Sequence, residues 1–585
     1  MDYLIIDFET YFDDSYSLRR MPTHEYIRDE RFRALGLAYW RSTFPTDTPG
    51  WAEGPQIKAM LDSLPYDVPW VAHNALFDAS VLQERFRKPY QRRPKLWLDT
   101  MLMARYCIGQ GILPPDLGTS LAALAEHFGL EAKGDTAGAV AAGGEALAEY
   151  ARHDIVLTRE ILHRLLPHVP RSALLEMDRT IRMGAEPVLQ IDHNLCQQEL
   201  DESEMDPELK KAVGSNVKFA ALLEAKGITP ATKISPTTNK ETYAFAKTDG
   251  FMQGLLVHDD PVVRFLAEAR IQSKSNLRRT RAQRFMRTGN PLPVPLLYSA
   301  AHTGRPGGQD GLNLLNLPRG GRLRQAIHAP EGHTLVICDS SQVEVRVLGW
   351  LAGDDTLLAD CLRGDEGGPD VYVTYAAEEM FRKPAEEVTD EERTISKPPV
   401  LACGYGQREN GLMAYAASMG IAMSRAQAER GVGGYHRRYR NVVRYWDRAM
   451  DEIRRTERQE LPSGRRLTYP NLRWEGRELL YDRPLIFSKL RKGQRDTRRV
   501  WHGLAVENAT QATAWDIVSW QIQQLHARWK VVLTPYDEVV LCVPEAEAEA
   551  ALAEALHWFS EVPEWAKGLP LRGEAIISKD YGASP

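Results

Sequence analysis

The stretch that decides the fold is HTLVICDSSQVEVR, which runs from His333 to Arg346. Leu335, Val336 and Ile337 form a short apolar run of the kind that makes a buried strand. The run stops at Asp339, so its carboxylate should emerge at the end of the strand. This places a carboxylate at a strand end, where a substrate or metal ion can reach it.

A second strand-like run, VVLTPYDEVVLCV from Val531 to Val543, carries Asp537 and Glu538 between two β-rich halves, as in a hairpin. Two carboxylates within about 4 Å would repel by roughly 4 kcal/mol at an effective dielectric constant of 20. Such a pair needs either a raised pKa or a divalent cation between its members. The rest of the sequence favours the cation.

The string DSSQVEVR resembles motif A of DNA polymerase family A, and YDE resembles motif C of that family. The resemblance implies that Asp339 and Asp537 hold two Mg²⁺ ions, or Mn²⁺, for nucleotidyl transfer. Glu538 would be a secondary member of the catalytic set. Tyr536 replaces the usual histidine, and its hydroxyl can still donate to the DNA backbone.

Composition describes a globular chain, because 43% of its 585 residues are hydrophobic and 26% are charged. This length predicts roughly three or four domains. No apolar run reaches about 18 residues and MDYLIIDFET lacks a signal-peptide pattern, so we expect a cytoplasmic protein with no membrane partner. The cytoplasm would be that of the host if the source is a phage. The six cysteines are scattered and are expected to be reduced thiols.

Carboxylates recur in the N-terminal region at spacings that suit a metal site. Asp7 and Glu9 follow a strand-like run at i and i+2, so they share one side of the strand. Asp78 lies four residues after Asn74, and Asp154 lies four residues after Tyr150, which is about one helical turn. Taken alone, an ordinary acidic strand end explains Asp7 and Glu9 equally well.

The ordered set resembles the 3′–5′ exonucleases of the DEDD family, in the subclass that uses a tyrosine. The resemblance covers roughly residues 1–170 and implies that Asp7, Glu9, Asp78 and Asp154 bind two metal ions while Tyr150 orients the attacking water. Asp99 is expected to be structural. His73 and His153 are expected to pack or hydrogen-bond rather than bind metal.

A basic segment, RIQSKSNLRRTRAQRFMR, carries seven cations and no acid between Arg270 and Arg287. A solvated helix face is the usual meaning of a charge run, but such faces mix signs. If all seven cations met phosphates, the logarithm of affinity would fall with the logarithm of salt at a slope of about −6. The polymerase resemblance places this segment in the thumb, with Arg278, Arg279 and Arg281 as candidate DNA contacts. Prolines at 207, 230, 236 and 261 should break the surrounding region into short pieces.

The stretch HTGRPGGQDGLNLLNLPRGGRLRQAI is rich in Gly and Asn and offers Arg305, Asn313 and Arg324 as donors. It resembles the primer-template contact segment of the family, which makes Arg305 and Asn313 candidate DNA contacts. Within motif A, Gln342 and Glu344 are assigned to the nucleotide site by resemblance, with the glutamate excluding a ribose 2′-hydroxyl. A surface salt bridge is the alternative for Glu344.

The stretch RTISKPPVLACGYG places Arg393, Lys397, Leu401 and Tyr405 at steps of four, a stripe on one helix face. It resembles motif B, in which the two cations bind the nucleotide triphosphate and the tyrosine lies beside the templating pair. Leu401 stands where the family has an aromatic residue. Because prolines disrupt a helix interior, we expect a helix that starts near Lys397 or is kinked there.

Two further segments complete the polymerase resemblance. Arg465 and Arg466 in GRRLTYP are possible DNA backbone contacts. Gln511 in ENATQATAWDIV matches a glutamine that touches the primer-template minor groove, although a buried helix amide is a plain alternative.

The sequence therefore predicts a multidomain α/β and α+β protein, with an RNase H-like exonuclease domain followed by a right-hand polymerase domain. The expected boundaries are 1–170 for the exonuclease, 171–330 for the thumb and start of the palm, 331–365 for the palm with motif A, 366–460 for the fingers, and 461–585 for the palm with motif C. The expected activity is primer extension with dNTPs on template DNA and 3′–5′ proofreading, as in bacteriophage replicative members of the family. We expect a monomer that also meets replication accessory proteins.

Three alternatives compete with this interpretation. A single-subunit RNA polymerase shares the palm aspartates and the Lys and Tyr of motif B, but Glu344 and the nuclease motifs argue against it. A nucleic-acid-binding scaffold with dead sites is disfavoured because every expected carboxylate is present. A protein that is only a nuclease is disfavoured, because about 400 residues of polymerase-like sequence would then have no function.

Overall fold

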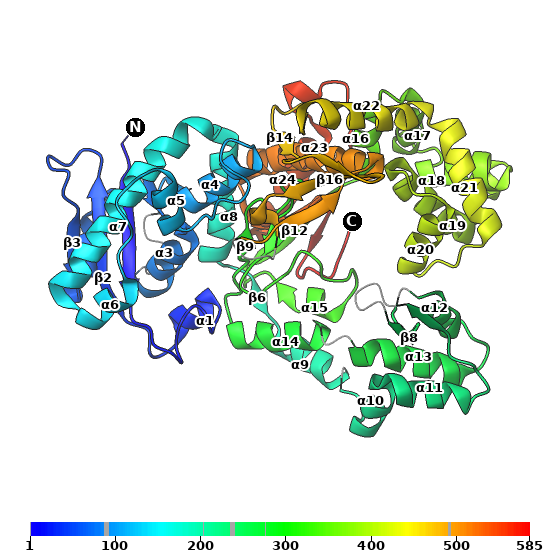
Figure 1. Ribbon diagram of the computed structural model, residues 1–585, viewed down its shortest axis with the longest axis horizontal. Helices are drawn as coiled ribbons and strands as arrows, with labels where there is room; N and C mark the ends of the chain where they lie inside the picture. Colours follow the sequence, from blue (N-terminus) through cyan, green and yellow to red (C-terminus); the bar gives the residue numbers. More distant parts are fainter. Residues whose placement is uncertain are drawn as a thin grey trace. The chain divides into compact units, whose positions relative to one another are not determined.

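The computed structural model describes residues 2–86, 93–202, 204–234, 240–247, 249–274, 277–488 and 493–585 (Figure 1). The chain divides into two compact units. The first comprises Met1–Ile191, Arg287–Val347 and Asp447–Pro585, and the second comprises Asp192–Met286 and Leu348–Trp446. Among the described residues, no helix combines the length and apolar character needed to cross a membrane.

The N-terminal part of the first unit is built on a five-stranded sheet in the order β3-β2-β1-β4-β5. Strands β1, β2 and β3 are antiparallel, whereas β4 and β5 run parallel to β1. The strands are β1 (Leu4–Thr10), β2 (Ala34–Arg41), β3 (Gly50–Glu53), β4 (Pro69–Ala72) and β5 (Leu96–Asp99).

Helices pack against this sheet, in the blue and cyan part of Figure 1. Helix α7 contacts β1 and β2, while α3 and α8 contact β5. The helices are α3 (Ala75–Val81), α4 (Thr100–Gly109), α5 (Leu121–His127), α6 (Thr136–Ala142), α7 (Gly144–Leu165) and α8 (Arg171–Ala185). The apolar residues of β1 are buried, and its two acids lie on opposite sides of Phe8 in the sequence, so they share one side of the strand.

A second, four-stranded antiparallel sheet in the same unit has the order β18-β19-β12-β20. The strands are β12 (His333–Ser340), β18 (Lys530–Leu533), β19 (Glu538–Pro544) and β20 (Gly573–Ser578). Helix α24 (Ala548–Ser560) packs on β12 and β20, and α23 (His502–His526) contacts α24, α8 and β18. The predicted strand before Asp339 and the predicted hairpin around Asp537 are therefore confirmed.

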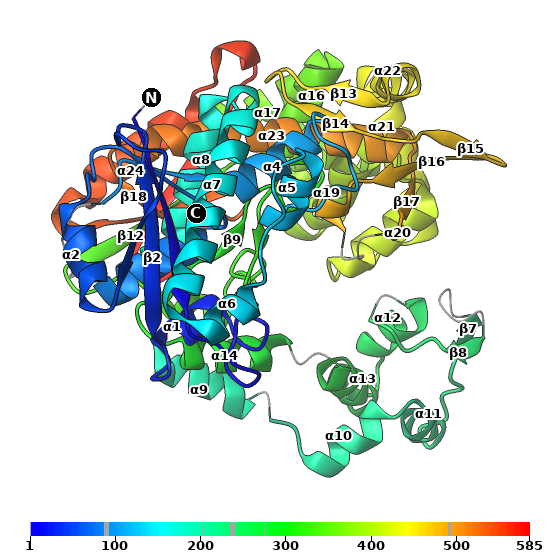
Figure 2. The same cartoon turned by 60° about the vertical axis from the view of Figure 1, so that its left-hand side comes forward.

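The first segment of the second unit is a group of short helices with one β-hairpin (Figure 2). Its elements are α9 (His193–Glu202), α10 (Pro207–Gly214), α11 (Asn216–Glu224), β7 (Thr232–Ile234), β8 (Glu241–Tyr243), α12 (Gly250–Leu256), α13 (Pro261–Lys274) and α14 (Leu277–Thr288). Residues such as Phe219, Phe245 and Leu266 form a small core of its own. Pro207 and Pro261 each begin a helix, as their fixed φ favours, while Pro236 lies outside the described residues.

The second segment of this unit is helical. It contains α17 (Asp355–Asp365), α18 (Val371–Tyr375), α19 (Asp390–Ala402), α20 (Glu409–Ser418) and α21 (Arg425–Arg438). It also includes the second half of α16 (Val343–Ala352) and the first part of α22 (Arg440–Thr456). Helix α19 runs through Pro398 and Pro399, so a start near Lys397 is wrong, while the alternative of a kink there stays a prediction. Thr389 and Glu392 form a capping box that starts the helix at Asp390 instead.

Candidate active sites

Asp339 and Asp537 meet at one end of the four-stranded sheet. The register between β12 and β19 pairs Asp339 with Glu538. The backbone N–H of Ser340 donates to the carbonyl of Asp537 at 2.9 Å, which fixes the turn between β18 and β19 beside the end of β12. Two distant sequence motifs thus deliver neighbouring carboxylates through one strand pairing.

The surroundings of these two aspartates favour a cation. Burial and the charge of Asp537 raise the pKa of Asp339 to about 7. Burial likewise raises the pKa of Asp537. Arg319 donates to Oδ2 of Asp339 at 2.9 Å, although its own side chain is 62% exposed. Carboxylate oxygens are the ligands that Mg²⁺ and Mn²⁺ prefer, and one mostly exposed arginine is the only ion-pair partner of Asp339 among the described residues, so the two aspartates fit such an ion.

Glu538 has a different environment from its two neighbours. Its side chain and that of Arg324 are each only 4% exposed and form an ion pair at 3.0 Å. The hydroxyl of Tyr581 donates to the same carboxylate at 2.6 Å. Glu538 therefore takes a structural position beside the aspartates, and Arg324, expected as a DNA donor, is instead its buried partner.

Glu344 forms an ion pair with Arg305, the arginine predicted to contact DNA. The Arg305 guanidinium also lies 5.4 Å from the centre of the Tyr536 ring. Tyr536 adopts a left-handed backbone conformation with φ of 60°, and Gln342 does so with φ of 54°. Residues from three separate motifs are thus linked around the end of β12.

The two predicted amide contacts to DNA have local partners. The Asn313 side chain accepts a hydrogen bond from the backbone N–H of Leu315 at 3.1 Å. Gln511 lies half-buried on α23 and donates to Glu507 at 3.2 Å. Neither side chain is fully buried, so both keep the exposure that a nucleic-acid contact needs.

The basic segment on α13 and α14 is less exposed than its sequence suggested. Arg278 is exposed and lies 3.7 Å from Glu199, and Arg279 is half-buried. Arg281 is only 9% exposed, and burial lowers its pKa. Arg270 is buried and donates to the carbonyl of Val213 at 2.5 Å. Arg270 and Arg281 are therefore poorly placed to meet phosphates, and the slope of about −6 for seven contacts is an upper limit, while Arg278 and Arg279 stay candidate DNA contacts.

Motif B lies on α19 and the turn that follows it, in the second unit. Arg393 donates through Nε to Asp370 at 2.9 Å. Lys397, Leu401 and Tyr405 are half-buried. Within the described residues, Lys397 has no recorded ion pair, so its ammonium is available to an anionic ligand.

In the N-terminal sheet, the predicted nuclease carboxylates converge. Ligand oxygens of Asp7, Glu9 and Asp154 all lie within 4.8 Å of one another. Asp78 accepts a hydrogen bond from the backbone N–H of Phe8 at 3.0 Å, which holds α3 against β1. The structure therefore brings together a set that spans almost 150 residues of sequence.

The electrostatics of this cluster also suit a divalent cation. Burial and the charge of Asp154 raise the pKa of Asp7 to about 7, and burial with the charges of Asp7 and Asp154 raises that of Glu9 to about 9. Burial also raises the pKa of Asp78. Oδ1 of Asp154 is buried with no hydrogen-bond partner in the described part of the chain. Hard cations satisfy such oxygens, so the residues fit a divalent ion here too.

Sequence reasoning missed Lys133, which forms an ion pair with Asp154. Its ammonium also lies 4.7 Å from the centre of the Tyr150 ring, and the Tyr150 hydroxyl is 2.6 Å from that of Thr136. Arg319 was missed in the same way at the other carboxylate site. Both residues come from irregular segments, where no spacing rule marks a basic side chain as functional.

Three neighbours of the nuclease motifs have the structural roles that were expected. Asp99 caps α4 and accepts hydrogen bonds from the backbone N–H groups of Asn74 at 3.0 Å and Ala75 at 2.9 Å. The His73 ring bonds to Thr100 at 2.9 Å. His153 bonds to the carbonyl of Ala132 at 3.2 Å.

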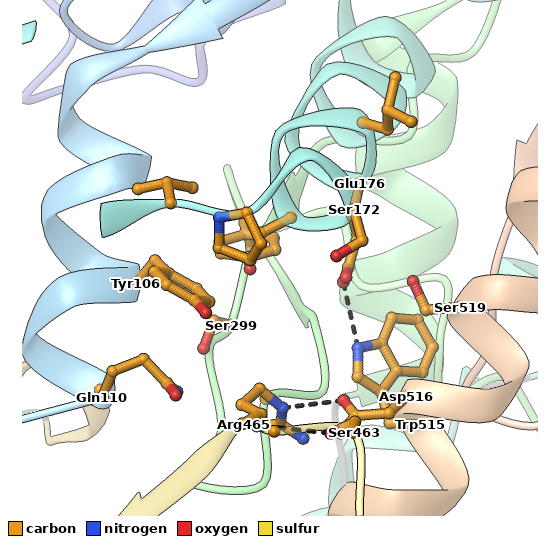
Figure 3. A pocket seen from close by; sticks show the side chains of 18 of the residues that line it. Tyr106, Gln110, Ser172, Glu176, Ser299, Ser463, Arg465, Trp515, Asp516 and Ser519 are labelled. Atoms are coloured by element: carbon orange, nitrogen blue, oxygen red, sulfur yellow. Dashed lines mark hydrogen bonds and ion pairs between the residues drawn. The ribbon is translucent and has the colours of Figure 1, made fainter. Parts of the chain in front are cut away.

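A cavity of about 680 Å³ in the first unit is lined by parts of α4, α8 and α23 (Figure 3). Arg465, a possible DNA contact by sequence, donates here to Asp516 at 2.8 Å and to the carbonyl of Thr303 at 2.8 Å. Trp515 donates to Glu176 at 3.1 Å in the same cavity. Arg465 thus ties the 463–466 loop to α23, while Arg466 remains exposed.

Comparisons with known proteins agree with this architecture. Residues 203–583 match the family model described as DNA polymerase family A. The chain is 29% identical over 284 residues to the DNA polymerase of Bacillus phage SP02, covering 44% of this chain and 43% of that protein. It is 31% identical over 290 residues to DNA polymerase I of Pseudomonas aeruginosa, covering 47% of this chain and 28% of that protein. The chain thus spans less than half the length of these curated relatives.

A solved structure shares the fold. It is the POL domain of Pol1 from M. smegmatis, described as a complex with DNA primer-template and dNTP. The TM-score is 0.71 at 18% sequence identity, and the match covers 99% of this chain and 95% of that chain.

Proposed function

The chain belongs to DNA polymerase family A, and from this premise we propose that it extends the 3′ end of a primer along a DNA template with dNTPs. The observation that carries the proposal is the pairing of β12 with β19, which sets Asp339 beside Asp537. The relatives named as DNA polymerases, in a phage and in bacteria, support a role in DNA replication. The bound primer-template and dNTP of the M. smegmatis protein support the same partners here.

Asp339 and Asp537 would hold divalent cations, which when bound supply positive charge for the attacking 3′ oxygen and the departing pyrophosphate. Arg393 and Lys397, one turn apart on α19, would bind the triphosphate. Glu344 would bar a ribose 2′-hydroxyl, and its ion pair with Arg305 would hold it in position. Asn313, Gln511 and Tyr536 would contact the primer-template.

We also propose that the N-terminal part of the chain is an RNase H-like 3′–5′ exonuclease that removes mismatched primer ends. The four carboxylates Asp7, Glu9, Asp78 and Asp154 support this second activity, because clustered carboxylate oxygens serve as ligands for divalent ions. The sheet order, with three antiparallel strands followed by two parallel ones, supports the expected RNase H-like fold. The Tyr150 hydroxyl would orient the attacking water.

The test is a gel assay with a 5′-labelled primer on a longer template, in Mg²⁺, with no nucleotide, with dNTPs or with rNTPs. The expected result is shortening without nucleotide and lengthening only with dNTPs. Asp339→Asn should abolish lengthening and spare shortening, and Asp7→Asn should do the reverse. Asp14→Asn, at an exposed aspartate, is the matched control.

Three outcomes would overturn all or part of this proposal. Lengthening with rNTPs would remove the assignment of Glu344 and favour an RNA polymerase-like activity. Loss of both activities in one folded single variant would contradict the assignment of two separate sites. A catalytically inactive scaffold would leave the primer unchanged in every lane.

A further inference from the structure

A cavity of about 480 Å³ lies within the first segment of the second unit, beside the hairpin of β7 and β8 and the end of α13. Cavities of this size accommodate ligands the size of a nucleotide. Its lining combines two aromatic rings with four cations and does not include any of the carboxylates described above.

The aromatic part of the lining is Tyr243 and Phe245. Their rings are stacked, with centroids 4.9 Å apart and an angle of 5° between the planes. Phe245 is 6% exposed and its ring packs edge-on against Phe219 in the local core. Tyr243 is half-buried at the end of β8 and lines the cavity. The core thus holds Phe245 in place, and Phe245 in turn holds the Tyr243 ring in a fixed orientation.

The cationic part of the lining is Lys233, Lys247, Arg270 and Lys274. Lys233 is paired with Asp249 at 2.5 Å, whereas Lys247 and Lys274 are exposed and have no recorded ion pair within the described residues. One carboxylate therefore opposes four cations, and the cavity has an excess of positive charge.

Arg270 connects the two parts of the lining. It is 3% exposed, and its guanidinium lies 5.5 Å from the centre of the Phe245 ring. Its Nε is buried and has no hydrogen-bond partner in the described part of the chain. A buried donor without a partner is costly, so a ligand oxygen that reached it would be stabilised.

An aromatic wall beside unpaired cations matches a ligand with a flat ring and a phosphate. We propose that this cavity binds an unpaired nucleotide of single-stranded nucleic acid, with the base against Tyr243 and the backbone phosphates near Lys247 and Lys274. A base within a duplex has both faces covered by its neighbours, so the wall selects unpaired bases. The inference rests on the proposed function, since the substrate of a DNA polymerase includes unpaired nucleotides of the template strand.

The test uses the full chain with Asp7→Asn, which prevents degradation of the probe. A 12-nucleotide oligo(dT) containing one 4-thiothymine is cross-linked by light, and the tryptic peptides are mapped by mass spectrometry. The expected adduct lies in the peptide from Glu241 to Lys247. Absence of that adduct, with adducts elsewhere, would overturn the assignment of the site.

Variants give an independent readout by fluorescence anisotropy on the same oligonucleotide. At the cavity, Tyr243→Ala should weaken binding by roughly 5- to 150-fold, the range for loss of one stacked base. The double variant Lys247→Ala/Lys274→Ala keeps the aromatic wall and should reduce the salt slope by about 1.4. Lys210→Ala, an exposed cation on α10, is the matched control and should leave binding unchanged.

Two further arms separate the possible sources of failure. Competition by free dTMP as effective as that by oligo(dT) would show a nucleotide site and contradict strand binding. Primer extension is measured on the same proteins. If the Asp7→Asn protein extends primers but gives no adduct, and the cavity variants bind the oligonucleotide as tightly as it does, this inference alone is contradicted. If the Asp7→Asn protein extends no primer, the proposed function is contradicted.

Discussion

Removing Arg324 should destabilise the strands that carry the polymerase aspartates. Arg324 and Glu538 are each 4% exposed, and Glu538 lies opposite Asp339 in the sheet. In Arg324→Met the apolar volume is largely kept, but the Glu538 carboxylate remains in the interior, and Tyr581 is its one remaining donor among the described residues. Removing one partner of a buried ion pair lowers the free energy of unfolding by about 3–5 kcal/mol.

Hydrogen exchange is the appropriate measurement, because a chain of this size with two units need not unfold in one step. The stated free energy corresponds to a loss of protection of roughly 150- to 5,000-fold in the amides of β12 and β19. Peptides from the five-stranded sheet serve as an internal reference. Arg528→Met is the control, since Arg528 and Glu554 form a more exposed pair at 3.2 Å worth at most about 1 kcal/mol.

The effect should depend on pH with a defined sign. Burial raises the pKa of Glu538 in the folded protein, and Arg324 opposes that rise. A carboxyl with a raised pKa destabilises the folded state increasingly as pH rises above its unfolded value of about 4.3. The loss of protection in Arg324→Met should therefore be small near pH 4 and grow towards neutral pH.

A double variant decides whether the buried charge is the cause. Arg324→Met/Glu538→Gln removes the charge and keeps an acceptor for Tyr581, so it should recover most of the lost protection. Parent-like protection in Arg324→Met, or a double variant less protected than the single one, would refute the reasoning.

Three other predictions concern the nuclease-like region. Asp99→Ala removes the acceptor of backbone N–H groups at the starts of α3 and α4, and should lower stability by at least about 2 kcal/mol, seen as a fall in the lowest thermal transition. The pKa of Asp7 is raised to about 7 and that of Glu9 to about 9, so ionising these carboxyls destabilises the folded state. In EDTA, which removes divalent cations, the temperature of the lowest thermal transition should therefore fall as pH rises from about 4 to 9. A temperature that does not change with pH would contradict those pKa shifts. Lys133→Met removes an ammonium that competes with a metal ion for the Asp154 carboxylate, so calorimetric titration should show tighter Mn²⁺ binding. Weaker Mn²⁺ binding in this variant would contradict that competition.

The regular parts of both sites were predictable from sequence. Alternation on a strand fixes Asp7 and Glu9 to one side of β1, whatever the rest of the chain does. The apolar runs before Asp339 and around Asp537 define buried strands, whereas the pairing of β12 with β19 is known only from the structure. The structure bears out both arrangements.

The basic residues of the sites were not predictable, because their positions depend on tertiary structure. Lys133 and Arg319 reach their carboxylates from irregular segments through long, flexible side chains. Conversely, Arg270 and Arg281 belong to a basic run that was assigned to DNA contact, yet both side chains are buried. Charge spacing along a sequence does not report which side of a helix is covered.

Helix α19 shows how one local rule prevails over another. Pro398 and Pro399 lack the N–H groups that the carbonyls of Thr394 and Ile395 would accept, which favours a late start. The capping box of Thr389 and Glu392 supplies partners for N–H groups at the true start, and the buried prolines pack in the interior. Because the helix begins at Asp390, Arg393 and Lys397 stand one turn apart on the same face, where both cations could reach one polyanionic ligand. A start at Lys397 would have left Arg393 in a loop, so the early cap preserves the arrangement on which the proposed nucleotide site depends.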